Sequence, residues 1–179
     1  MGSHSPRDFD VLSSDEKRSG VEERWVSFQP YLLSKGYQLR PRYRPDWVPS
    51  WKVDTTRHPS DCEDSKDSMP VRVLDAIRTK DDLQVIIKML VPRQGEGQSE
   101  LAVLEYFSSP ELKGHPDNHV VRLLDSFPIP GKESGHFIVM PLLGEFRDPP
   151  FKTIAEIHDF LQQIFKAIIS IRLPDVMLI

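Results

Sequence analysis

The strongest constraint on the fold is a pair of β-branched runs that lie close together in the middle of the chain. They are Val71-Arg-Val-Leu-Asp-Ala-Ile-Arg78 and Leu83-Gln-Val-Ile-Ile-Lys-Met-Leu-Val91, and only Thr79-Lys-Asp-Asp82 separates them. Runs of this composition on either side of a short polar connection are typical of an antiparallel hairpin. We therefore predict two paired strands, at 71–78 and 83–91.

The segments after this hairpin predict a helix and then two more strands. Residues 98–107 place apolar side chains at helical spacing, and Pro110 follows soon afterwards. Strands are expected at 120–127 and 136–140, joined by a connection rich in proline and glycine. The predicted order is strand, strand, helix, strand, strand, which is an α+β fold with an antiparallel sheet.

The clearest helix in the sequence covers residues 153–171. Thr153 and Glu156 form a T-x-x-E capping box, and Pro174 ends the segment. Its apolar side chains form one broad stripe, made of Ile154, Ile157, Phe160, Leu161, Ile164, Phe165, Ile168 and Ile171. A large apolar patch marks either a surface for a protein partner or an aggregation hazard, so we predict one of these for the 154–171 helix.

The chain before residue 71 is expected to be less regular. Residues 1–20 are polar and are predicted to be a disordered tail. Helical spacing from Val21 onwards predicts a helix with Gly36 just past its end, kinked or interrupted by Pro30. We divide the chain into the tail, residues 21–70, a sheet domain at 71–150, and a terminal helix at 151–179.

A segment rich in proline and arginine, LRPRYRPDWVPSW, occupies residues 39–51. Interleaved arginine and aromatic side chains can bind RNA by stacking and phosphate contact, but we favour an extended strap whose Trp47 and Trp51 pack on the domain.

An acidic loop at 61–67 has no glycine for the sharp turn of an EF-hand loop. It is therefore expected to be solvated and not to bind calcium.

Composition narrows the classes of function. The chain has 179 residues and a formal net charge of -4, so no positive excess favours nucleic acid as a partner. The single cysteine, Cys62, excludes a disulfide framework within the chain and a multi-cysteine metal site, and the histidines have no metal-binding spacing. No apolar run is long enough for a membrane span or a signal segment. We expect an intracellular protein, cytoplasmic or nuclear, without a membrane partner.

The order of the predicted elements resembles the N-terminal lobe of a protein kinase. Val85-Ile-Ile-Lys88 matches the VAIK lysine motif, and Glu100 matches the helix αC glutamate that pairs with this lysine, with Glu105 as the alternative. The segments LRPRYRPDWVPSW, DCED, MPLL, DPPF and FLQQIFKAI are also similar to a divergent group of kinase-like proteins of mushroom-forming fungi. This resemblance extends over about residues 31–171. It implies an N-lobe sheet with a helix αC equivalent, followed by the first helix of a C-lobe.

The resemblance also implies a nucleotide site. The lysine would anchor phosphates, the strand before the turn at 79–82 would roof the adenine, and a gatekeeper and hinge would border its edge. By position, the implied residues are Lys88, Glu100, Val73, Ala76, Met140, Pro141 and Leu143. The implied activity is ATP-dependent protein phosphorylation of the Ser/Thr type.

Several residues depart from the family pattern. Lys66, Ser68 and Val71 replace the three glycines of the phosphate loop, so backbone N–H groups cannot approach phosphates as closely. Ile86 replaces the alanine of VAIK and adds three heavy atoms where adenine would lie. The stretch between the lysine and the glutamate is short for the family, which leaves their ion pair an open question.

The largest departure lies after the terminal helix. The sequence there runs Arg172-Leu-Pro-Asp175 and contains no HRD or DFG segment. We therefore assign no catalytic residue, expect no magnesium site and weak or absent ATP binding, and regard phosphoryl transfer by this chain alone as unsupported. The expected function is that of a truncated kinase-like chain. The alternatives are a non-catalytic interaction module of the pseudokinase type and an incomplete gene product without a function of its own.

Overall fold

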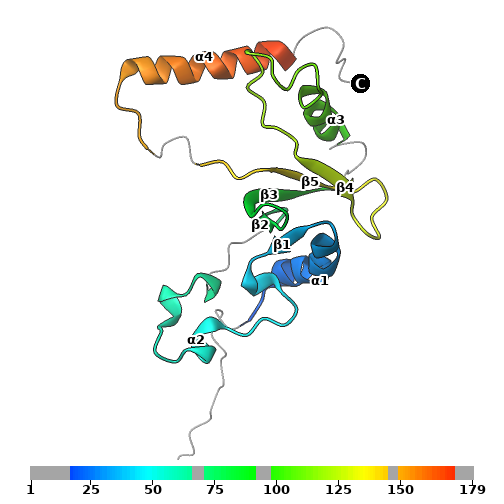
Figure 1. Cartoon of the computed structure of the whole chain (residues 1–179), viewed down its shortest axis with the longest axis vertical. Helices are drawn as coiled ribbons and strands as arrows, with labels where there is room; N and C mark the ends of the chain where they lie inside the picture. The colour runs from blue at the N-terminus through cyan, green and yellow to red at the C-terminus, as the bar shows by residue number, and fades with distance from the viewer. Residues whose placement is uncertain (1–16, 66–70, 92–97, 145–148, 172–179) are drawn as a thin grey trace, which may run out of the picture. The chain divides into compact units, whose positions relative to one another are not determined.

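The computed structural model describes residues 17–65, 71–91, 98–144 and 149–171. These residues form an α+β fold with a five-stranded antiparallel sheet in the order β1-β2-β3-β5-β4 (Figure 1). The chain divides into two compact units, Met1–Val71 with Ile77–Asp82, and Arg72–Ala76 with Leu83–Ile179. We call them the N-terminal unit and the sheet unit.

Helix α1, Gly20–Ser34, opens the N-terminal unit. Most of the predicted 1–20 tail lies outside the described residues, but Ser19 is the N-cap of α1 and forms a capping box with Glu22. The predicted interruption at Pro30 is wrong, because the helix continues through this residue to Ser34. The predicted C-terminal glycine is confirmed: Gly36 has a φ of 88°, which glycine adopts without strain.

The proline- and arginine-rich segment is more structured than an extended strap. It begins at the end of strand β1 (Tyr37–Leu39), contains the 3-10 turn η2 (Pro41–Tyr43) and ends in the short helix α2 (Ser50–Val53). Proline at or just before the first helical position loses no hydrogen bond, so these prolines start helical turns and do not prevent them. The 3-10 turns η3 (Pro59–Asp61) and η4 (Glu63–Ser65) follow.

The chain from Arg72 onwards confirms the predicted hairpin and helix. Its first elements are β2 (Val73–Arg78), β3 (Leu83–Leu90), α3 (Gln98–Phe107), β4 (Asp125–Pro128) and β5 (His136–Pro141). The strand predicted at 120–127 is shorter than expected and begins at Asp125. The preceding backbone uses side-chain partners instead, because the Leu123 N–H donates to Ser108 Oγ at 2.8 Å and the Val120 N–H to Asn118 Oδ1 at 3.1 Å.

Helix α4, Ile154–Ile171, confirms the predicted terminal helix. Its capping box is present, since Thr153 Oγ1 accepts from the Glu156 N–H at 3.2 Å and the Glu156 carboxylate accepts from the Thr153 N–H at 3.3 Å. Among the described residues, no helix combines the length and the apolar character that a membrane crossing requires.

Candidate functional site

One face of the sheet carries three of the strand residues that the kinase-like pattern singles out, Lys88, Met140 and Val73. In the antiparallel pair of β3 and β5, Lys88 lies opposite Ile138, and Ile86 lies opposite Met140. Because side chains alternate along a strand, these four side chains point to the same side of the sheet. The lysine therefore stands beside an apolar surface.

The neighbouring strand β2 extends this face. The Met89 N–H donates to the Arg72 carbonyl at 2.7 Å, so these two residues lie opposite each other. Counting along the antiparallel pair places Val73 opposite Lys88 and Asp75 opposite Ile86.

Helix α3 brings a carboxylate to the lysine. Glu100, in the first turn of α3, accepts from Lys88 Nζ at 2.5 Å. The side chains are 30% and 40% exposed, so the pair is accessible to a ligand. The short stretch between the two residues thus does not prevent the ion pair, because α3 already begins at Gln98. Glu105, the alternative partner, is exposed on the same helix.

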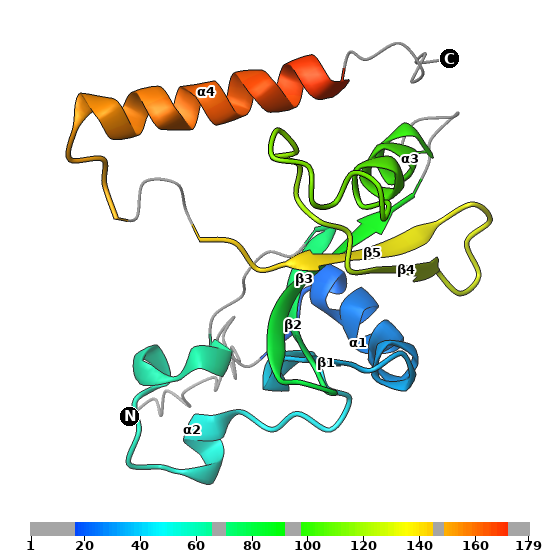
Figure 2. The same cartoon turned by 45° about the horizontal axis from the view of Figure 1, so that its top comes forward.

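Helix α3 is held in place by apolar packing. Leu104 forms a buried cluster with Leu90 of β3 and Ile138 of β5, and Leu101 and Met140 pack against it. The helix lies beside these two strands in both views (Figures 1 and 2). The position of Glu100 is therefore set by the core, since the cluster fixes the helix that carries it.

The other predicted site residues do not all lie on the same face of the sheet as Lys88. Val73 and Ala76 are three positions apart in β2, so their side chains point to opposite faces and cannot line one pocket together. Ala76 is buried at 2% exposure, while Val73 is 43% exposed and shares the face of Lys88. Pro141 ends β5, and Leu143 is exposed just beyond it. Lys66 and Ser68 of the predicted loop lie outside the described residues.

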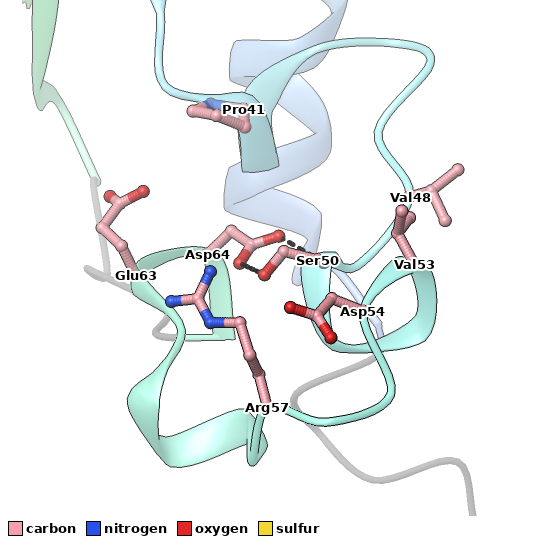
Figure 3. Close-up of a pocket in the computed structure, with 8 residues that line it drawn as sticks. All are labelled: Pro41, Val48, Ser50, Val53, Asp54, Arg57, Glu63 and Asp64. Atoms are coloured by element: carbon pink, nitrogen blue, oxygen red, sulfur yellow. Dashed lines mark hydrogen bonds between the residues drawn. The ribbon is translucent and has the colours of Figure 1, made fainter.

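A separate concavity lies within the N-terminal unit. It has a volume of about 480 Å³ and is lined by Pro41, Val48, Ser50, Val53, Asp54, Arg57, Glu63 and Asp64 (Figure 3).

Asp64 is buried at 6% exposure, so the prediction of a fully solvated acidic loop is wrong at this residue. Its carboxylate accepts from Ser50 Oγ at 2.6 Å, from the Ser50 N–H at 2.9 Å and from Trp47 Nε1 at 2.8 Å. Burial alone would raise the pKa of Asp64, but the hydrogen bonds from Ser50 and Trp47 outweigh it and lower the pKa.

The hydrogen bond from Trp47 to Asp64 is one of several contacts that hold the two strap tryptophans in place. The guanidinium groups of Arg18 and Arg42 each lie 5.0 Å from the centre of the Trp47 ring. Trp51 is buried and lies edge-on to Trp47 at 6.3 Å between ring centres. Both tryptophans pack within the protein, as the strap interpretation predicts. Stacking on RNA would require Trp47 to give up its arginine contacts.

A buried ion pair in the N-terminal unit was not anticipated. Arg42 Nε lies 2.5 Å from Glu22 Oε1, and the two side chains are 2% and 0% exposed. The S-x-x-E pattern of Ser19 and Glu22 was a readable capping signal. The pairing with Arg42 had no local signal, because the two residues are 20 positions apart.

Comparisons with protein-family models, with curated proteins and with solved structures find no match. In the described part of the chain, no group of three or more histidine, cysteine or acidic residues is placed to hold a metal ion. The contact of Lys88 with Glu100 gives the candidate site an oriented lysine cation beside the apolar side chains of Ile86 and Met140.

Proposed function

We propose that this chain is a kinase-like N-lobe module that binds the phosphates of a nucleotide through Lys88 and does not itself transfer phosphate. The single observation that carries the proposal is the contact between Lys88 and Glu100 at 2.5 Å. A strand lysine held by a helix glutamate is the arrangement with which protein kinases grip phosphates.

The chemistry of the pair supports this role. A lysine ammonium has three N–H donors, and Glu100 accepts from one of them. The remaining donors can serve phosphate oxygens, with which a charged donor makes short and strong hydrogen bonds. The glutamate also limits the motion of a long side chain, which reduces the entropy lost on binding.

The same residues do not support catalysis. These 179 residues contain no HRD or DFG segment. Phosphoryl transfer depends on a catalytic aspartate and on residues that hold magnesium ions. Binding without transfer is accordingly the activity proposed for this chain.

Replacing Lys88 by methionine is expected to weaken the binding of Mg-ATP at least about tenfold, because a charge-assisted hydrogen bond to phosphate is lost. Isothermal titration calorimetry measures this change. Glu100→Gln should give a smaller loss, since Lys88 keeps its charge but loses an ionic partner. Lys80→Met removes an exposed lysine from the hairpin turn and is the matched control, which should bind like the wild type. Equal binding by Lys88→Met and wild type, or no binding by the wild type, would contradict the proposal.

A second candidate function is a protein-interaction module that uses α4. The observation that favours it is the exposure of the apolar stripe, which reaches 85% at Ile154 and 59% at Phe165. Lys166 pairs with Asp117 at 3.0 Å, and it lies two positions from Ile164 and from Ile168, hence on the other side of the helix. The apolar stripe is thus free of this contact.

Replacing Phe165 by glutamate tests this second function. Phe165 is 59% exposed, so a charge there should disturb an intermolecular contact and leave the folded monomer intact. If the stripe mediates association, sedimentation velocity should show that the variant shifts from an associated form to the monomer. Gln162→Glu adds a charge at an exposed polar position of the same helix and should change nothing. A wild-type chain that remains a monomer and captures no partner would argue against the function.

A further inference from the structure

The face around Lys88 is covered at one end and only partly covered at the other, where Ile86 and Met140 are half-buried. In the direction of Leu90, helix α3 covers it through the cluster of Leu90, Leu104 and Ile138. In the opposite direction, the next side chain of β3 on this face is Ile86. A ligand whose phosphate is held by Lys88 therefore extends its remaining part over Ile86.

Ile86 lies at the centre of the partly covered end of this face. Met140 lies directly across from it on β5, and Asp75 lies across from it on β2. Side chains opposite each other in an antiparallel pair have Cβ atoms about 4.5–5.5 Å apart, so Ile86 is flanked closely on both sides. A β-branched side chain in a strand is also stiff at its first torsion. It cannot fold away to let a flat ring approach the backbone of β3.

The stiffness of Ile86 limits the area that the apolar part of a ligand can contact. The apolar part then has to rest on the tip of Ile86, with little area in contact. Dispersion contacts fall off steeply when only one edge of a ring has partners.

We infer that Ile86 determines the specificity of the Lys88 site and restricts its ligands to phosphate-bearing molecules for which a purine base adds little affinity. This inference rests on the proposed binding of phosphate by Lys88. The inference assigns the class of ligand: the site recognises a polyphosphate group and does not recognise the base.

The test compares two probes by isothermal titration calorimetry: tripolyphosphate and ATP, each with magnesium. The wild type is expected to bind both with dissociation constants within about threefold of each other. Ile86→Ala should bind ATP about tenfold more tightly than the wild type, with unchanged affinity for tripolyphosphate. Leu83→Ala removes an apolar side chain from the opposite face of the same strand and should leave the ratio of the two affinities unchanged.

The outcomes separate this inference from the proposed function. A wild type that binds ATP tenfold or more tightly than tripolyphosphate overturns the inference, and so does an Ile86→Ala ratio equal to that of the wild type. In both cases phosphate binding by Lys88 stands. If neither protein binds any phosphate probe, the proposed function fails and the inference fails with it. Circular dichroism checks that Ile86→Ala is folded. If it is not, Ile86→Val replaces it and should shift the ratio in the same direction by a smaller factor.

Discussion

Replacing Glu22 by glutamine is expected to lower the free energy of unfolding of the N-terminal unit by about 3–5 kcal/mol. Glutamine has nearly the shape of glutamate and can still accept from the Ser19 N–H, so the helix cap is preserved. What is lost is the negative charge next to Arg42, whose side chain is only 2% exposed. A buried cation without its counterion bears a large desolvation cost.

Intrinsic fluorescence can measure this effect on the N-terminal unit alone. All three tryptophans of the chain, Trp25, Trp47 and Trp51, belong to this unit. Urea titrations followed by tryptophan emission should therefore give an earlier midpoint for Glu22→Gln. The matched control is Glu23→Gln, because Glu23 is exposed and its Arg18 partner is 3.7 Å away. This control should change stability by less than about 1 kcal/mol.

Two further readouts check the cause. Burial by itself would raise the pKa of Glu22, but hydrogen bonds from Arg42 and Ser19 and the charge of Arg42 lower it below its usual value of 4.5. The ion pair thus contributes its full stability above the unfolded pKa and loses it as the pH falls through the lower folded pKa. Glu22→Gln should be less sensitive to acid in that range. Replacing both Glu22 and Arg42 by methionine should cost less than the two single losses combined, whereas strict additivity would show that the two charges do not interact.

Replacing Phe137 by alanine is expected to destabilise the sheet unit by about 3–5 kcal/mol, because it leaves a cavity in a packed core. Phe137 is fully buried in β5 and lies directly opposite Phe127 of β4, with ring centres 5.7 Å apart. The same strand carries Ile138 and Met140, so loosening it should also disturb the face of Lys88.

Hydrogen exchange of the β3 and β5 amides, together with far-UV circular dichroism, is the appropriate measurement, since the sheet unit has no tryptophan. Phe137→Leu keeps most of the volume and should cost less than the alanine variant. Phe151→Ala removes the same ring from a position that is 37% exposed, and a loss below about 1 kcal/mol is expected there. If Phe137→Ala and Phe151→Ala were equally mild, the packing of β4 on β5 would not be a source of stability.

Those features of the candidate site that depend on neighbouring residues in the sequence were predictable. Lys88 and Glu100 were expected as partners from the resemblance to the kinase N-lobe, and α3 begins and ends where the apolar pattern indicates. The position of Ala76 could have been questioned from sequence, because a spacing of three in a strand puts it on the face opposite Val73. The contact of Lys88 with Glu100 needed the packing of Leu104 on Leu90 and Ile138.

The N-terminal unit was harder to predict for a physical reason. Its structure depends on contacts between polar groups far apart in the chain, such as Glu22 with Arg42 and Trp47 with Asp64. Periodicity reports which faces of helices and strands are apolar, and it contains no signal for these pairs. Strand β1 was missed because three residues are too few for alternation to be visible.

The sequence by itself determined the order of the elements from β2 to α4, the caps of α1 and α4 and the placement of a lysine in β3 and a glutamate at the start of α3. These features depend on residues within a few positions of each other, where backbone preferences and side-chain periodicity act directly. Only the tertiary structure decided that Glu22 and Arg42 form a buried pair, that Asp64 is buried, and that Ile86 lies opposite Met140. Such features arise when strand register and core packing bring distant groups together, because a buried charge or polar group is stable only where a partner meets it.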